Sequence, residues 1–170
     1  MPMPEPTPHP SWRTALVRGV SSALVAVFCY ATVSRVPSLR EPYWAPIAAV
    51  VVLYPEREAT KTAAFERFGG TLIGCLIGWG SAVWWHENIL LYGVAIVAAV
   101  AVCTLLRLEN ASRLCAVAVT VLTLVPHDES AHRVALHRFV EVSYGVACAL
   151  GYTLVADFVG ARWRRRGVAP

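Results

Sequence analysis

The feature that most constrains this chain is a series of long apolar runs that takes up most of its length. Of its 170 residues, 56% are hydrophobic and only 15% are charged, which is less charge than a soluble domain usually carries. Six membrane spans of about 20 residues each would leave little room for a soluble catalytic domain. The sequence therefore predicts an all-α fold, a polytopic membrane helix bundle with six transmembrane helices. The apolar runs lie at about 14–34, 43–54, 68–85, 88–106, 111–125 and 134–159.

Two of these runs, 43–54 and 111–125, are short for a membrane crossing. We assign them to the membrane because each lies between two longer runs. Prolines alternate through the first ten residues, a pattern that holds the chain extended and excludes a helix. We expect residues 1–11 to be a disordered Pro-rich tail, residues 12–160 to be the membrane domain, and residues 161–170 to be a basic cytoplasmic tail.

Lysine and arginine residues set the predicted orientation of the six crossings. When both termini are placed in the cytoplasm, 11 of the 15 basic residues fall on that side and 4 fall outside. This bias is typical of helical membrane proteins. It also explains the net charge of +4 without nucleic acid, because the sequence ARWRRR at 161–166 then faces anionic lipid headgroups. We expect a multi-pass protein of the cell inner membrane.

An internal repeat appears when the sequence is compared with itself at a shift of 71 residues. Residues 50–80 and 121–151 then share nine identities in 31 positions without a gap. Several of the matches involve residue types that membrane helices do not share by composition alone. These pairs are Pro55 and Pro126, Glu58 and Glu129, Arg67 and Arg138, Phe68 and Phe139, Gly74 and Gly145, and Gly80 and Gly151.

The repeat predicts an inverted 3+3 architecture. Each copy, about 12–86 and about 87–160, holds three predicted spans, and an odd number of spans inverts the second copy in the membrane. Inverted repeats are an architecture of transporters, whose binding site lies near the membrane midplane between the two copies. We expect Arg67 and Arg138 to lie toward opposite ends of the membrane, because the repeat matches them.

Glycines mark the expected helix-packing faces. Gly70, Gly74 and Gly78 follow Arg67 at helical spacing and share its face. Small residues at such spacing let two helices approach closely. In the second copy, Gly145 occupies the matching position. The sequence thus predicts that Arg67 points toward protein and away from lipid.

Four side chains are candidates for a transport pathway: Arg67, Arg138, Glu141 and His137. Charges retained inside membrane spans usually pair or line a pathway. Glu141 is spaced to meet both Arg138 and His137 on one helix face, which forms either a proton-responsive cluster or a structural ion pair. A competing interpretation has Arg67 near the interface, where it would snorkel to headgroups. The residues alone leave these alternatives open.

The remaining polar and sulfur-bearing residues give no sign of an enzyme, a metal site or a cofactor. No nucleophile elbow, P-loop or dinucleotide-binding glycine pattern occurs. We expect the cluster of His127, Asp128, Glu129 and His132 to be a solvated outer loop. The five cysteines have no metal or redox spacing and are expected to be packing residues. They are Cys29, Cys75, Cys103, Cys115 and Cys148.

Two segments resemble the fusaric acid resistance and aromatic acid exporter superfamily. That family shows a Tyr-Trp-Ala start, an apolar strip, and then an Arg followed by a Gly-Thr-x-x-Gly helix; its closing helix resembles the sequence HRFVEVSYGVACALGY found here. The matching residues are Tyr43, Trp44, Ala45, Arg67, Gly70, Thr71 and Gly74, followed later by Arg138, Glu141 and Gly145.

The resemblance implies efflux of aromatic carboxylates and related organic anions through the inner membrane. Many relatives carry a cytoplasmic helical domain or two membrane modules in one chain, whereas this sequence has one module, so we expect a homodimer or other homo-oligomer. The expected partners are an organic anion and the lipid bilayer, without nucleic acid. Two alternatives remain, a passive anion channel with the same residues and a scaffold or envelope-integrity subunit that transports nothing.

Overall fold

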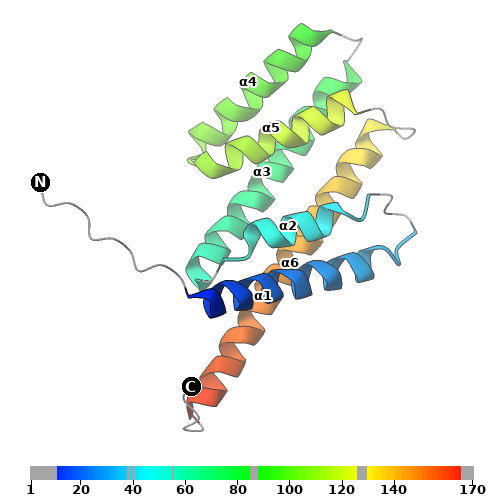
Figure 1. The fold of residues 1–170 in the computed structure, drawn as a ribbon. Coiled ribbons are helices and arrows are strands. Elements are labelled where there is room, and N and C mark those ends of the chain that lie inside the picture. Colours follow the sequence, from blue (N-terminus) through cyan, green and yellow to red (C-terminus); the bar gives the residue numbers. More distant parts are fainter. Residues whose placement is uncertain are drawn as a thin grey trace, which may run out of the picture.

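The computed structural model describes residues 11–37, 39, 41–54, 56–84, 88–125 and 130–165, and every regular element in them is an α-helix. The predicted Pro-rich tail lies almost wholly outside the described residues, as does the end of the basic tail. Within these residues six helices follow one another along the chain (Figure 1). They are α1 (Trp12–Val33), α2 (Trp44–Val52), α3 (Arg57–Val83), α4 (Ile89–Leu105), α5 (Glu109–Leu124) and α6 (Ala131–Arg165).

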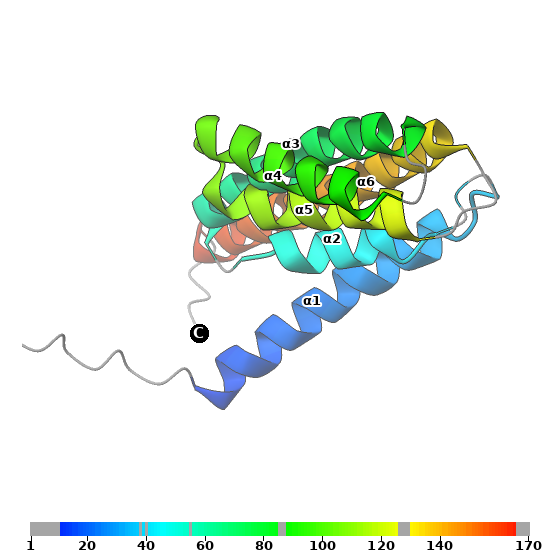
Figure 2. The same ribbon diagram turned by 90° about the horizontal axis from the view of Figure 1, so that it is seen from above.

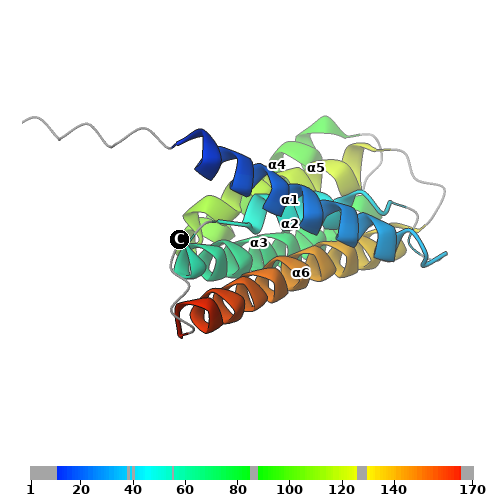
Figure 3. The same cartoon turned by 60° about the horizontal axis from the view of Figure 1, so that its bottom comes forward.

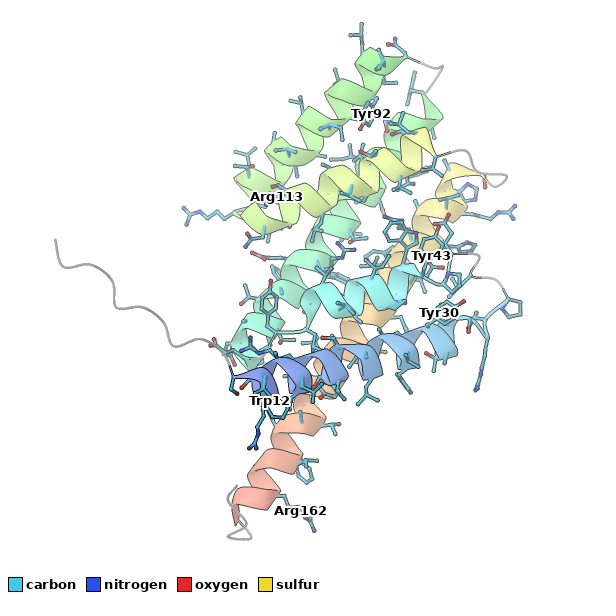
Figure 4. All side chains as sticks on the ribbon, viewed as in Figure 1. Trp12, Tyr30, Tyr43, Tyr92, Arg113 and Arg162 are labelled. Carbon is cyan, nitrogen blue, oxygen red and sulfur yellow. The ribbon has the colours of Figure 1, made fainter. Side chains whose placement is uncertain are left out.

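Consecutive helices run in opposite directions. As a result, α1, α3 and α5 begin at the same end of the bundle at which α2, α4 and α6 finish (Figure 1). Trp12, Arg113 and Arg162 mark this end, and Tyr30 and Tyr43 mark the other (Figure 4). We call the first the basic end, because most of the Lys and Arg residues lie toward it, and the second the opposite end.

The helices differ in whether they are long enough to cross a membrane. By length and composition, two of the described helical segments qualify, Trp12–Val33 and Ala131–Arg162. Ile89–Leu105 and Asn110–Leu124 are apolar but shorter. Helix α2 has only nine residues, about 14 Å at the usual rise of an α-helix. The all-helical prediction is confirmed for the described residues, whereas the count of six crossings stays a prediction.

The centre of the bundle is formed by α3 and α6, which lie side by side and antiparallel (Figure 3). Helix α5 packs on α3 and α2 packs on α6, while α4 lies on α5 and α1 on α2. One apolar cluster joins α1, α2 and α6, and a second joins α4 and α5 with side chains of α3. The two outer helices, α1 and α4, therefore sit at opposite edges of the molecule (Figure 1).

Glycines allow the inner helices to approach. A methyl group added at Gly74 would lie 2.7 Å from a backbone carbonyl oxygen of α5, and one added at Gly145 would overlap the carbonyl oxygen of Ala45 on α2. Gly70 and Gly78 also face α5. All four glycines are buried. The structure thus places them where a helix backbone or a side chain of the neighbouring helix leaves no room for a larger residue.

The first half of α1 is not packed closely against the rest of the bundle. Seen from above, its basic-end half diverges from α2 and the rest of the molecule (Figure 2). Its buried residues, Val25, Cys29 and Val33, all lie in the second half. Residues 11–20 are exposed without exception. This divergence opens a groove between α1 and α6, described below.

Candidate functional site

Arg67 and Arg138 lie at similar depth in the centre of the bundle. The next residue of each helix shows this directly, because the rings of Phe68 on α3 and Phe139 on α6 pack together with their centroids 5.0 Å apart. The expectation that the two arginines lie toward opposite ends is therefore wrong. The physical reason is that α3 and α6 are antiparallel and cross at the matched pair Phe68 and Phe139. The residue before each phenylalanine therefore lies at a similar depth.

The depth of this crossing follows from helix geometry. Arg67 comes ten residues after the start of α3 at Arg57, which is about 15 Å along the helix axis. Its side chain is only 6% exposed. A guanidinium that reached a headgroup would be exposed, so this burial contradicts the interpretation in which Arg67 snorkels to the membrane surface.

Arg138 is held between an aromatic ring and two acidic residues. It is 4% exposed, and its guanidinium carbon lies 3.1 Å from the centroid of the Trp44 ring at the start of α2. A guanidinium over an indole face is a favourable cation–π arrangement. The indole N–H of Trp44 donates to Oε2 of Glu41 at 2.7 Å. The charges of Glu41 and Glu141 both act on Arg138.

Glu141 lies one turn along α6 from Arg138 and is 1% exposed. Its carboxylate is in contact with the backbone of Glu41. Among the described residues, Oε1 of Glu141 and one terminal nitrogen of Arg138 have no hydrogen-bond partner, and no ion pair joins the two side chains. The structure therefore does not contain the direct Arg138–Glu141 pair that the sequence left open.

Arg67 has different surroundings from Arg138. The residue before it, Glu66, accepts a hydrogen bond from the side-chain amide of Asn110 on α5 at 3.1 Å. Within the described part of the chain, Nε of Arg67 has no hydrogen-bond partner. Arg67 is also close enough for its charge to act on Arg138. Two cations and one fully buried carboxylate thus share the interior.

His137 and the predicted outer loop contribute less to this site. His137 is half-buried on α6 beside Arg138. Residues 127–129 lie outside the described residues, and His132 is exposed, with its ring Nε2 3.5 Å from the Ser130 hydroxyl. The described residues contain no group of three or more His, Cys, Asp or Glu side chains that is able to hold a metal ion.

The sequence did not predict two cysteine contacts. All five thiols are free, but the thiol of Cys29 on α1 contacts that of Cys148 on α6, and Cys103 on α4 contacts Cys115 on α5. Their sequence separations carry no motif, because the contacts arise between helices. The contacts of Glu41 and Trp44 with the arginine site are likewise not predicted by the sequence, because they also arise between helices.

The comparison with known families completes this description. The fusaric acid resistance protein-like family matches residues 23–151. This chain belongs to that family. The resemblance seen in the sequence is therefore confirmed, and both helices of the arginine site lie largely within the matched region. No curated protein and no solved structure matches the chain.

Membership of this family has two direct consequences. Together with the apolar helices, it makes the chain an integral membrane protein. It also makes the chain a protein related to membrane transport, of the fusaric acid resistance type, since the family consists of transporters rather than enzymes. The fully buried charges described above are then charges held inside a membrane protein.

Proposed function

We propose that this protein is an inner-membrane permease that exports aromatic carboxylates or related organic anions and works as a homodimer. The observation that carries the proposal is the pair of buried arginines at the α3–α6 crossing. Arg67 and Arg138 are both buried there, and Glu141 is the one carboxylate of the described residues that is buried with them. Charges inside membrane spans are costly and usually mark a substrate or ion pathway.

An organic anion would supply the missing partner. A buried charge without a counter-charge is unfavourable. An opposite charge in contact offsets the cost of burial only when the hydrogen bonds of both groups are satisfied. The guanidinium groups of Arg67 and Arg138 offer planar forks of donors that match a carboxylate, and both carry an unpartnered nitrogen. The ring of an aromatic carboxylate would find apolar surroundings beside Phe68 and Phe139.

The two arginines differ in their surroundings, and we assign them different roles for this reason. Trp44 already covers one face of Arg138 and is itself held by Glu41. Arg67 has no such cover among the described residues. We infer that the anion binds first at Arg67, with Arg138 as the second cation. Glu141 is the acidic group that adjusts the charge of the site, because its protonation removes a negative charge next to Arg138.

The arrangement of the helices supports an inverted 3+3 repeat. In such a repeat α1, α2 and α3 correspond to α4, α5 and α6 in that order. The packing of α5 on α3 then corresponds to the packing of α2 on α6. The outer helices correspond as well, because α1 packs on α2 and α4 packs on α5. Gly74 and Gly145 are at matched positions and face matched helices. The pair Phe68 and Phe139 would lie on the pseudo-two-fold axis, where equivalent residues meet.

Burial refines the register of this repeat. Buried positions of α3 and α6 correspond at a shift of 71, the shift found in the sequence. In α1 and α4 the buried residues correspond at a shift of 70, as do those of α2 and α5. An extra residue between α5 and α6 accounts for the change. Two further identities at a shift of 71, Val50 with Val121 and Leu53 with Leu124, are therefore displaced by one residue from the structural correspondence. The Pro55 and Pro126 match lies outside the described residues.

The experiment for the proposed function is uptake of labelled 4-hydroxybenzoate by proteoliposomes containing the purified chain. A permease coupled to protons accumulates the anion against its gradient when a pH difference is imposed. A passive channel only equilibrates it, and a scaffold moves none. Absence of any uptake above protein-free liposomes would contradict the proposal.

Two variants test the assigned roles. Arg138→Lys should lower the uptake rate, because Lys keeps the charge but loses the bidentate fork and the planar contact with Trp44. Glu141→Gln should retain binding of the anion but remove the pH dependence of uptake. Wild-type rates and pH profiles in both variants would favour the scaffold interpretation, in which these charges only support the fold.

A further inference from the structure

A groove lies between α1 and α6 at the basic end, well away from the arginine site. Its volume is about 730 Å³, and its walls come from the first half of α1, the two residues that follow α2 and the second half of α6. Small-molecule sites usually fall between about 300 and 1,000 Å³. The groove forms where α1 diverges from the bundle (Figure 2).

The wall formed by α1 is polar on the side that faces the protein. Val25 and Cys29 of α1 face inward and are buried. One turn nearer the basic end, the same side of the helix carries Ser21, Ser22 and then Arg18, and all three line the groove. This face of α1 therefore changes from apolar to polar where the helix leaves its neighbour, which gives the groove one polar wall.

The charges of the groove favour an anion. Asp157 on the α6 wall lies 3.6 Å from Arg57 and is therefore already paired. Arg13 lies over the ring of Trp12, with 5.4 Å between the guanidinium carbon and the ring centroid. No carboxylate among the described residues forms an ion pair with Arg18. Arg13 and Arg18 are thus the cations that line the groove without an ion pair among the described residues, and Arg18 is the deeper of the two.

Hydroxyl groups close the inner end of the groove. Tyr152 on α6 donates a hydrogen bond to the Ser21 hydroxyl on α1 at 2.7 Å. This contact joins the two walls beyond Arg18, between the groove and the rest of the bundle. An anion that entered from the basic end would pass Arg13 and Asp157, then reach Arg18, and meet this hydrogen bond last.

We propose that the groove is a hydrated vestibule that binds small organic anions at Arg18, with the Ser21–Tyr152 hydrogen bond as its inner boundary. The proposal rests on the proposed function only for the choice of anion. It adds a second anion site on α1, which the arginine site does not use, and on a part of α6 that lies 14 to 19 residues after Arg138. Lipid filling the groove is the alternative that the experiment must exclude.

Site-specific cysteine labelling in lipid nanodiscs tests for water in the groove. Ser22→Cys places a thiol on the groove wall. Val20→Cys is the matched control, because Val20 lies at nearly the same depth, is 51% exposed, and points about 200° around the helix from Ser22. We expect a charged, membrane-impermeant thiosulfonate to modify Cys at position 22 at least about tenfold faster than at position 20, after subtraction of labelling in the unmodified chain.

The charge of the reagent tests the role of Arg18. An anionic sulfonate reagent should react at position 22 faster than a cationic trimethylammonium reagent of similar size. Arg18→Gln should lower this ratio at least about threefold, whereas Arg113→Gln, which removes another basic-end arginine away from the groove, should not. Added 4-hydroxybenzoate should slow the labelling at position 22 at least about twofold.

Each result decides the proposal. Labelling no faster at position 22 than at position 20 would show that the groove is no more accessible to water than the outward side of α1, and it would overturn the proposal. A ratio unchanged by Arg18→Gln, or labelling unaffected by 4-hydroxybenzoate, would show that no anion binds there and would also overturn it. If the labelling behaves as expected while the uptake experiment fails, the vestibule stands and the proposed transport function falls.

Discussion

The outer helices α1 and α4 occupy corresponding places in the two halves of the molecule but are held differently. Helix α4 turns directly into α5. At this turn the Leu108 amide donates to the Cys103 carbonyl at 2.9 Å and the Arg107 amide to that of Thr104 at 3.0 Å, the two bonds of a Schellman motif. Helix α1 is joined to α2 by the longer connection 34–43.

The two outer helices also differ in how much of their length is packed against the bundle. Each has three buried residues at four-residue spacing, which begin at Val25 in α1 and at Ala95 in α4. Thirteen residues of α1 precede the first of them, against six in α4. These additional residues of α1 form the polar wall of the groove. One half of the molecule is therefore closed by a short helical hairpin, whereas the other half carries an extended helix that diverges toward the basic end.

The largest expected effect comes from filling the matched glycine contacts of both halves. Gly74→Leu and Gly145→Leu should each strongly lower the melting temperature in detergent, since even the first carbon of the new side chain meets a backbone carbonyl. Overpacking typically costs about 1–3 kcal/mol for much smaller changes. Gly80→Leu and Gly151→Leu are matched controls, because an added Cβ at either meets nothing within 4 Å.

Equal melting temperatures in the Gly74 and Gly80 variants would show that α3 and α5 do not approach as described. A loss confined to one half would be equally informative. If Gly145→Leu is tolerated and Gly74→Leu is not, α2 is able to move away from α6, and the two halves differ in rigidity at their inner helices as well as at their outer ones.

A smaller effect is expected in the mobility of the outer helices. Amide hydrogen exchange should be faster in residues 13–22 of α1 than in residues 90–99 of α4, because α1 is unpacked over this segment. Tyr152→Phe removes the bond to Ser21 and should speed exchange in α1 by about 2- to 10-fold, the equivalent of one hydrogen bond. Tyr92→Phe, which removes the 2.9 Å contact with Thr120, is the control. Equal protection of α1 and α4 would contradict the difference between the halves.

The smallest predicted effect concerns the α4–α5 turn. Arg107 has a positive φ of 59°, a left-handed conformation that glycine adopts without steric cost. Arg107→Gly should therefore stabilise the protein by up to about 1 kcal/mol, and Arg107→Ala should not, because alanine keeps the Cβ. Thermal unfolding in detergent measures both. Destabilisation by glycine would indicate that the arginine side chain itself supports the turn.

Much of the fold followed from the sequence for identifiable reasons. Apolar runs predicted the helices, and the spacing of Gly70, Gly74 and Gly78 predicted one packing face, because both signals are periodic along one helix. The family was recognised from Tyr43, Trp44 and the Arg-Gly-Thr pattern, which are local motifs. The count of crossings is harder, since the nine residues of α2 are as consistent with a short buried helix as with a span.

The site was only partly predictable. The repeat singled out Arg67 and Arg138, but their common depth depends on where α3 crosses α6, which no spacing within either helix encodes. The stacking of Trp44 on Arg138, the contact of Glu41 with Glu141 and the cysteine contacts all join different helices. Such contacts appear only once the helices are placed, so sequence patterns along a single helix cannot reveal them.

The most direct measurement is the uptake of labelled 4-hydroxybenzoate by proteoliposomes carrying Arg67→Gln, compared with the unmodified chain and with Arg113→Gln. Arg67 is the buried cation with an unpartnered Nε and no aromatic cover among the described residues, so its loss removes the proposed first site for the anion. We expect uptake to fall at least about tenfold in Arg67→Gln, with unchanged folding by circular dichroism, and to stay near the unmodified rate in Arg113→Gln. Undiminished uptake in Arg67→Gln would contradict an anion pathway through the α3–α6 crossing.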